Sequence, residues 1–182
     1  MLRFKGKIGG INIEIKFEVT EEDYIKFNLY HVENSPAHKK SYNLLRYVLP
    51  LLCSVPIYTI GTTIFRQPEI YWIIIAVLFV VVWIITYPKK YKKMIIKETK
   101  KVLKEGDNSS IFGKKTMLID DNKIKVFNED SSETVLRESI KAVKVYEDMI
   151  LIYLSGFTAH IIPIRYLNEE TKKFLVEELT VK

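Results

Sequence analysis

The side chains that most often carry chemistry are few in this sequence: three histidines and one cysteine. Cys53 lies in an apolar stretch, where a thiol packs as a small apolar group, and a single cysteine cannot form an intrachain disulfide. His31 and His38 are separated by Ser35-Pro36, so we do not expect them to share a helical face. No cysteine or acidic residue stands at a ligand spacing from them, so the pattern predicts no metal site. His160 is expected to be a half-exposed residue of a sheet.

Two short motifs resemble ligand-binding loops in sequence, but each lacks an essential feature of the loop that it resembles. Gly113-Lys-Lys-Thr116 ends like a phosphate-binding loop, but Asn108 stands where the first glycine would be, and no helix is predicted to follow. Asp120-Asp121-Asn122 lacks the length and the closing glutamate of a calcium loop, and is typical of a hairpin turn. The sequence therefore predicts no catalytic residue, no metal and no cofactor, and it favours a non-enzymatic protein.

A run of lysines is the strongest charge feature. Residues 89–104 contain eight lysines against one acidic residue, Glu98. A lysine near a membrane surface attracts anionic lipid headgroups by about 1 kcal/mol. We therefore expect headgroup contacts from the lysines nearest the preceding apolar segment: Lys89, Lys90, Lys92, Lys93 and Lys97. The alternative is that these lysines only mark a cytoplasmic helix end. Because this run concentrates the positive charge, the net charge of +6 does not indicate a nucleic-acid surface.

Two uncharged apolar segments must position these lysines. Hydrophobic residues make up 48% of the 182 residues, which excludes a polar disordered chain, and residues 47–65 and 70–87 contain no Asp, Glu, Lys or Arg. As helices they would be roughly 28 Å and 27 Å long, close to a hydrocarbon core of about 30 Å. Pro50, Pro56 and Gly61 interrupt the first segment. The short linker 66–69 predicts an antiparallel transmembrane hairpin.

The distribution of charge predicts how the hairpin is oriented. Residues 37–46 carry a net charge of +3 and residues 89–104 carry +7, whereas the linker holds only Arg66 and Glu69. Positively charged flanks stay in the cytoplasm, so we expect a multi-pass protein of the cell membrane with both termini cytoplasmic. Four parts follow: a cytoplasmic strand and helix (1–46), the hairpin (47–87), a basic juxtamembrane stalk (88–110) and a cytoplasmic domain (111–182).

Strand and helix signals lie on both sides of the hairpin. Alternation over Ile11–Val19 predicts an amphipathic strand, and Thr20-Glu-Glu-Asp23 predicts a helix that ends near Ser35-Pro36. Turn clusters divide the C-terminal part into six strands and a final helix capped by Asn168. The predicted strands are 115–120, 123–128, 133–136, 140–146, 149–154 and 158–164. A lone strand is not stable in water, yet the pattern does not say whether Ile11–Val19 joins this sheet.

The predicted fold class is therefore α+β: an antiparallel transmembrane helical hairpin plus a small PH-like split β-barrel with a C-terminal helix. The order of the parts and several motifs resemble the YcxB-like family of bacterial membrane proteins over nearly the whole chain. The motifs are Thr20-Glu-Glu-Asp-Tyr24 with His31 after it, Leu136-Arg-Glu-Ser-Ile140, Tyr146-Glu-Asp-Met-Ile-Leu-Ile-Tyr153 and Ala159-His-Ile-Ile-Pro-Ile-Arg165. The resemblance implies two membrane spans and a C-terminal PH-like domain, in a family whose biochemical role is largely uncharacterised.

The chain departs from that family at two positions, and three functions stay open. The family usually has a tryptophan before the serine, at the position of Arg137 or Glu138, and a lysine where Ile164 stands. The first function is a PH-like domain that presents a protein- or lipid-binding surface at the inner face of the membrane. The second is protection against membrane-active peptides, as in immunity-type proteins. The third is an accessory subunit of a transporter complex, in which Pro50, Pro56 and Gly61 admit a partner helix.

Overall fold

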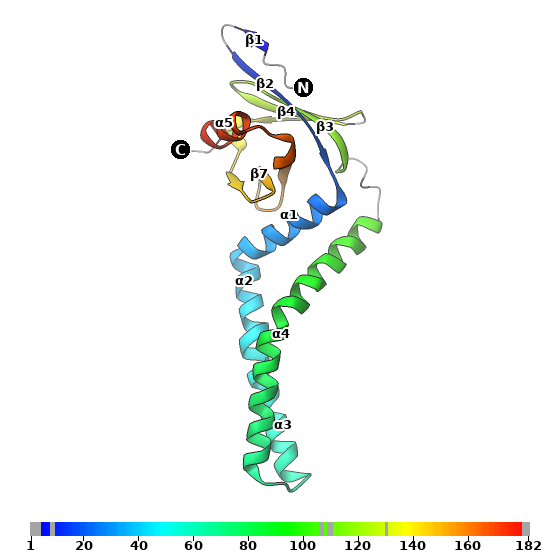
Figure 1. Cartoon of the computed structure of the whole chain (residues 1–182), viewed down its shortest axis with the longest axis vertical. Coiled ribbons are helices and arrows are strands. Elements are labelled where there is room, and N and C mark those ends of the chain that lie inside the picture. The colour runs from blue at the N-terminus through cyan, green and yellow to red at the C-terminus, as the bar shows by residue number, and fades with distance from the viewer. Residues whose placement is uncertain (1–4, 8–9, 106–107, 109–110, 130, 180–182) are drawn as a thin grey trace. The chain divides into compact units, whose positions relative to one another are not determined.

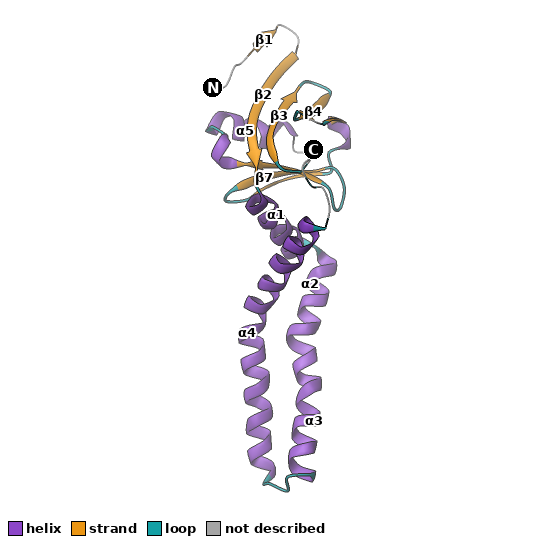
Figure 2. Cartoon of the chain, turned by 90° about the vertical axis from the view of Figure 1, so that its right-hand side faces the viewer, coloured by secondary structure: helices purple, strands orange, loops and turns teal. Residues whose placement is uncertain are grey.

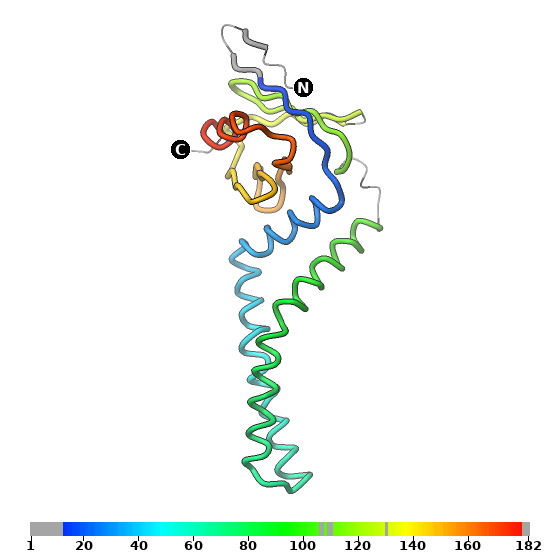
Figure 3. The backbone as a smooth tube through the Cα atoms, viewed as in Figure 1, coloured from blue at the N-terminus to red at the C-terminus, as the bar shows by residue number. Residues whose placement is uncertain are grey.

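The computed structural model describes residues 5–7, 10–105, 108, 111–129 and 131–179. The chain divides into two compact units. Met1–Phe27 and Val102–Lys182 form the first, which we call the sheet unit, and Asn28–Lys101 form the second, which we call the hairpin unit. Figure 3 follows the path of the backbone from one unit into the other and back. The sheet unit is therefore assembled from both ends of the sequence.

Two antiparallel sheets make up the sheet unit (Figure 1). The first has the order β1-β2-β3-β4-β5 and the second the order β6-β7-β8, and neither is closed into a barrel among the described strands. The strands are β1 (Lys5–Lys7), β2 (Gly10–Val19), β3 (Gly113–Ile119), β4 (Lys123–Phe127), β5 (Ser132–Leu136), β6 (Ala142–Val145), β7 (Met149–Tyr153) and β8 (Ala159–Pro163). The observed class is α+β, with two small open sheets in place of the single split barrel expected from the sequence.

The strand predicted over Ile11–Val19 is confirmed, and it joins the C-terminal part. It is β2, which pairs antiparallel with β3 from Ile13 opposite Ile119 to Val19 opposite Gly113. The six C-terminal strands are confirmed within two residues at each end, whereas β1 was not predicted. The alternation of β2 has the expected cause, because Ile13, Ile15, Phe17 and Val19 are all buried in the core.

The second sheet buries its middle strand completely. All five residues of β7, Met149–Tyr153, are buried, which explains why this segment is continuously apolar instead of alternating. The last helix, α5 (Glu169–Leu179), follows the short 3₁₀ turn η3 (Ile164–Tyr166) and buries Leu175 and Leu179. The side chain of Asn168 accepts a hydrogen bond of 2.8 Å from the backbone N–H of Thr171, so the predicted helix cap is confirmed.

The Arg137 side chain also contacts α5. It lies in the 3₁₀ turn η2 (Arg137–Ser139) and donates to the backbone carbonyl of Glu178. Its guanidinium is also 3.6 Å from the Glu178 carboxylate. An arginine here ties the end of β5 to the final helix by charge-assisted hydrogen bonds.

The helix α1 (Glu21–Asn34) begins at the predicted cap and ends at the predicted break. The Asp23 carboxylate accepts a hydrogen bond of 2.9 Å from the Thr20 backbone N–H and one of 2.8 Å from the Thr20 hydroxyl. The Thr20 hydroxyl in turn accepts a hydrogen bond of 3.3 Å from the backbone N–H of Asp23, which completes a reciprocal capping arrangement. The chain then passes from α1 through Ser35 into α2 (Pro36–Asn43), whose first residue is a proline, as helix starts favour.

The two apolar segments form long helices. The first runs as α2, a π-helical turn η1 (Leu44–Val48) and α3 (Leu49–Thr63), and the second is α4 (Glu69–Lys104). The π-helical turn ends two residues before Pro50, whose missing N–H interrupts the regular ladder of i→i−4 bonds. Within α3 the hydroxyls of Ser54, Thr59 and Thr62 donate to backbone carbonyls one turn earlier, so these polar groups are satisfied inside the helix.

Helices α3 and α4 are antiparallel neighbours (Figure 2). The indole N–H of Trp83 donates a hydrogen bond of 3.1 Å to the Leu45 carbonyl. The Trp72 ring packs against Gly61 near the other end of the hairpin. The helical run Pro36–Thr63, which comprises α2, η1 and α3, and the helix α4 are each long and apolar enough to cross a membrane. Among the described residues of α4 only Ala76 is buried inside the molecule, unlike in the core helix of a soluble protein. The expected helical hairpin is present.

Candidate functional site

The antiparallel arrangement brings the chain before the first apolar segment beside the chain after the second. The ring of Tyr42, in α2, lies 5.5 Å from the ring of Tyr87 and 5.0 Å from that of Tyr91, both in α4. The Arg46 side chain also contacts α4, where it donates a hydrogen bond of 3.3 Å to the Ile84 carbonyl. The basic residues before the first segment and those after the second therefore meet at one end of the hairpin.

A groove of about 640 Å³ lies at this end of the hairpin unit. Its apolar wall combines aliphatic and aromatic side chains with a proline, and its polar residues are mostly basic. The lining residues are Leu29, Val32, Glu33, His38, Lys39, Tyr42, Asn43, Pro88, Lys89, Tyr91, Lys92 and Ile95. Its volume is typical of sites for small organic ligands, which lie between about 300 and 1,000 Å³. We call it the interfacial groove.

The structure divides the five predicted headgroup lysines into two sets. Lys89 and Lys92 line the interfacial groove. Lys90, Lys93 and Lys97 do not line it, and their spacing of three and four residues places them together on another face of α4. All five side chains are exposed, and in the described part of the chain none of them forms an ion pair. Lys90 instead lies 6.0 Å from the centre of the Trp83 ring.

The groove has the chemistry of an amphiphile site. Three ammonium groups, on Lys39, Lys89 and Lys92, face one carboxylate, on Glu33, so the groove is net positive. The apolar wall can hold a hydrocarbon or ring, while the lysines can hold an anionic group at the rim. Lys39 and Tyr42 were not among the predicted contacts. Their signal was available, since an antiparallel hairpin places residues just before the first segment next to those just after the second.

The two N-terminal histidines lie closer than the sequence indicated. The rings of His31 and His38 are 6.5 Å apart, edge to face, although Ser35-Pro36 separates them. The two residues stand on different helices, as expected, because the extended backbone of Ser35 (ψ 124°) ends α1 before α2 begins. The rings approach each other across this break. Among the described residues, no group of three His, Cys, Asp or Glu side chains is placed to hold a metal ion.

The remaining motifs take structural roles. Gly113 opens β3, so Lys114 and Thr116 lie in a strand and no helix follows them. The Asp120 carboxylate accepts from the backbone N–H of Asn122 at 3.0 Å and of Lys123 at 2.8 Å, as in a hairpin turn. Although partial burial opposes ionisation, these two bonds hold the pKa of Asp120 below its usual value. Cys53 is half-buried in α3.

The breaks in the first segment are largely filled by the chain itself. Pro50 and Gly61 are buried, and the Trp72 ring occupies the space above Gly61. Pro56 is the exposed one of the three. Only the region of Pro56 is therefore available to a further helix among these three positions.

No known protein family, curated protein or solved structure matches this chain. The resemblance to the YcxB-like family rests on the motifs and the order of parts described above.

Proposed function

We propose that this chain is a non-enzymatic integral membrane protein that binds anionic phospholipid in the interfacial groove, at the cytoplasmic face of the cell membrane. Its two apolar helices cross the bilayer, with both termini and the sheet unit in the cytoplasm. The sheet unit is proposed to act as a PH-like binding domain, as in the YcxB-like family that the motifs resemble. The interfacial groove, where Lys39, Lys89 and Lys92 surround an apolar wall, is the observation that carries the proposal.

The membrane location is supported by exposed apolar side chains along both helices. Large apolar residues are more than 50% exposed along the whole hairpin, for example Leu52, Val55, Ile74, Leu78 and Ile85. An apolar surface of this extent would promote association in water and is expected only where lipid or protein covers it. The orientation is supported by charge, because the groove end is rich in lysine and the linker end carries only Arg66 and Glu69.

The lipid is expected to occupy the groove with its headgroup at the lysines. These lysines lie outside the apolar segments, since Lys89 comes two residues after Tyr87 and Lys39 eight residues before Tyr47. This is the depth at which phospholipid headgroups lie when the apolar segments fill the hydrocarbon core. An acyl chain or glycerol backbone would then contact Tyr42, Pro88 and Tyr91.

Native mass spectrometry of the full chain, extracted with its lipids in mild detergent, tests this proposal. The triple variant K39Q/K89Q/K92Q should lose bound anionic phospholipid, with a weakening of about 100-fold if each lysine contributes about 1 kcal/mol. The matched control K90Q/K93Q/K97Q removes the same charge from the other face of α4 and should retain the lipid. Equal loss in both variants, or no loss in the first, would contradict a lipid site in the groove.

A further inference from the structure

The interfacial groove holds more positive charge than a single negative charge would compensate. Its charged lining residues are three lysines, Lys39, Lys89 and Lys92, and one acid, Glu33. All four residues are exposed, and in the described part of the hairpin unit none of them forms an ion pair. Three ammonium groups against one carboxylate leave the groove with a net charge of +2, before any charge on His38 is counted.

A fourth cationic group lies beside the aromatic wall of the groove. The Arg46 guanidinium donates a hydrogen bond of 3.3 Å to the Tyr42 hydroxyl, and its central carbon lies 5.8 Å from the centre of the Tyr42 ring. Its Nε–H is held by the Ile84 carbonyl, which keeps the side chain at this place. Among the described residues no carboxylate pairs with Arg46, so its charge adds to the positive potential at the groove.

The lysines line the groove from two helices. Lys39 belongs to α2, whereas Lys89 and Lys92 are three residues apart on one face of α4. The rings of Tyr42 and Tyr91, 5.0 Å apart, join the two helices within the same lining. Each ammonium group carries three N–H donors, so an anionic group in the groove can receive hydrogen bonds from both helices.

Membrane lipids present two kinds of phosphate to such a site. A phosphate diester, as in phosphatidylglycerol, carries one negative charge and two terminal oxygens. A phosphate monoester, as in phosphatidic acid, has three terminal oxygens and carries close to two negative charges above its second pKa of about 6. Because the Coulomb energy is proportional to the charge on the lipid, a positive groove attracts the monoester more strongly. The third oxygen also gives each of the three lysines its own acceptor.

We infer that the interfacial groove binds a lipid phosphate monoester in preference to a phosphate diester. The monoester group lies between Lys39, Lys89 and Lys92, and the apolar body of the lipid contacts Tyr42 and Tyr91. The surrounding lysines favour loss of the second proton of the phosphate, so the bound form is the dianion. This inference rests on the proposed function, and it narrows the ligand of the groove from anionic phospholipid to one chemical class.

Native mass spectrometry of the full chain, stripped of lipid in mild detergent, tests the inference at pH 8. The probes are dioleoyl phosphatidic acid, dioleoyl phosphatidylglycerol and the net-neutral dioleoyl phosphatidylcholine, which share their acyl chains. We expect phosphatidic acid to bind at least about tenfold more tightly than phosphatidylglycerol. Equal binding of the two anionic lipids, both tighter than phosphatidylcholine, would overturn the inference and leave the proposed function standing. Equal binding of all three lipids would overturn both.

A single groove variant tests whether the lysine charge sets this preference. Lys89→Gln removes one positive charge, which should weaken binding of phosphatidylglycerol about fivefold and of phosphatidic acid about 25-fold, because the attraction doubles with the lipid charge. Lys93→Gln removes the same charge outside the groove and should leave the ratio of the two affinities unchanged. Equal weakening of both lipids by Lys89→Gln, or the same change of ratio in Lys93→Gln, would contradict the inference.

The pH dependence of the preference gives a second readout. At pH 5 most of the phosphatidic acid carries a single negative charge, so its advantage over phosphatidylglycerol should shrink at least about fivefold from the value at pH 8. Any proton gained by Glu33 or His38 makes the groove more positive toward both lipids, so the ratio of the two affinities is the quantity to compare. A ratio that stays the same between pH 8 and pH 5 would overturn the inference.

Discussion

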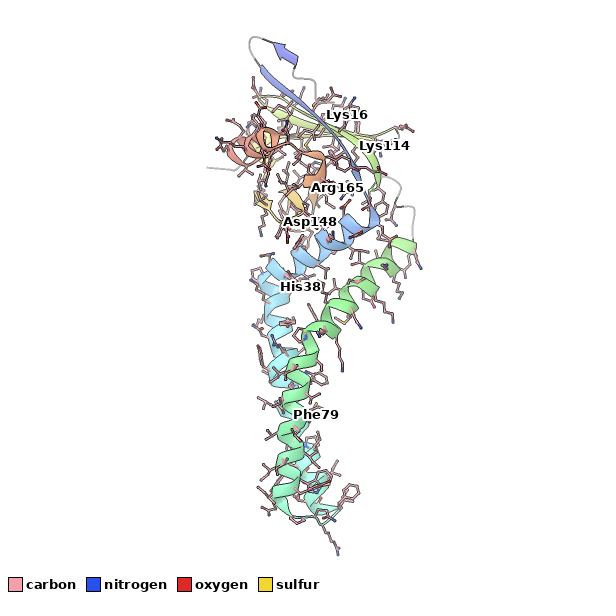
Figure 4. The ribbon with its side chains drawn as sticks, in the orientation of Figure 1. Lys16, His38, Phe79, Lys114, Asp148 and Arg165 are labelled. Carbon is pink, nitrogen blue, oxygen red and sulfur yellow. The ribbon has the colours of Figure 1, made fainter. Side chains whose placement is uncertain are left out.

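Arg165 holds the carboxylate of Asp23 through two charge-assisted hydrogen bonds, 2.7 Å from Nη1 to Oδ1 and 2.6 Å from Nη2 to Oδ2. The residues are 142 positions apart and come from two of the motifs quoted for the YcxB-like resemblance. Arg165, labelled in Figure 4, also donates a hydrogen bond of 3.2 Å to the Glu18 carbonyl. It therefore connects η3 to both β2 and the start of α1. This pair joins the two sequence segments that build the sheet unit.

Removal of Arg165 should destabilise the sheet unit more than an exposed ion pair would. The Asp23 side chain is only 4% exposed, so Arg165→Met leaves a buried carboxylate with the Thr20 groups as its remaining donors among the described contacts. We expect a loss of about 2–4 kcal/mol in unfolding free energy. Thermal unfolding of the full chain in detergent measures it.

Lys26→Met is the matched control for that experiment. Lys26 lies on the same helix and pairs with Asp148 at 3.0 Å, but its side chain is 38% exposed. The exposed pair should contribute less than about 1 kcal/mol. Equal losses from the two variants would show that the Asp23–Arg165 pair has no special role.

Acid should weaken the sheet unit through the same pair. Although burial opposes ionisation, the hydrogen bonds from Arg165 and Thr20 hold the pKa of Asp23 below its usual value. A lowered pKa in the folded state means that the stabilisation is complete above the unfolded pKa of about 3.9 and is lost as the pH falls through the folded value. The melting temperature should therefore fall below about pH 4 in the natural sequence, with a smaller fall in Asp23→Asn. Parallel pH profiles of the two proteins would contradict this.

Gly61 should be required for the hairpin. A Cβ atom at this position would overlap the Trp72 ring, so Gly61→Ala must displace the indole. We expect a loss of roughly 1–3 kcal/mol, the usual cost of overpacking, measured by thermal unfolding in detergent. Gly156→Ala, where a Cβ atom would meet nothing within 4 Å, should change stability by less than about 0.5 kcal/mol.

The combination of Gly61→Ala with Trp72→Ala provides the control for mechanism. If the clash is the cause, the double variant should lose less than the sum of the single losses, because the indole ring is no longer present. Additive losses would place the effect of Gly61 elsewhere, for example in the backbone of α3.

The sequence predicts local structure well where alternation, caps and breakers are present. Thr20, Asn168 and the Ser35-Pro36 break each mark an observed helix boundary, and the alternation of Ile13 to Val19 marks a strand. It does not predict how strands are divided between sheets, because alternation identifies the inward face of a strand and not its neighbour. The strand β1 was missed because Lys5-Gly6-Lys7 carries no apolar alternation.

The sequence predicts the interfacial groove better than it predicts the grouping of Lys115, Glu133 and His160. The interfacial groove follows in part from the antiparallel hairpin, although the role of Lys39 needed the observed register. The grouping of Lys115, Glu133 and His160 around one cavity of the sheet unit left a weaker signal. Lys115 stands two residues before Met117 in an alternating strand, which places it inward, but only the pairing of three distant strands brings it near Glu133 and His160.

Labelling of single cysteines in intact cells tests the central claim, that two helices cross the membrane with the lysine-rich end inside. Two exposed positions suit the cysteines: Gln67 in the linker and Asp121 in the turn between β3 and β4. In a Cys53→Ser background, a membrane-impermeant maleimide should label Gln67→Cys in intact cells and Asp121→Cys only after the cells are opened. Labelling of Asp121→Cys from outside intact cells would contradict the account.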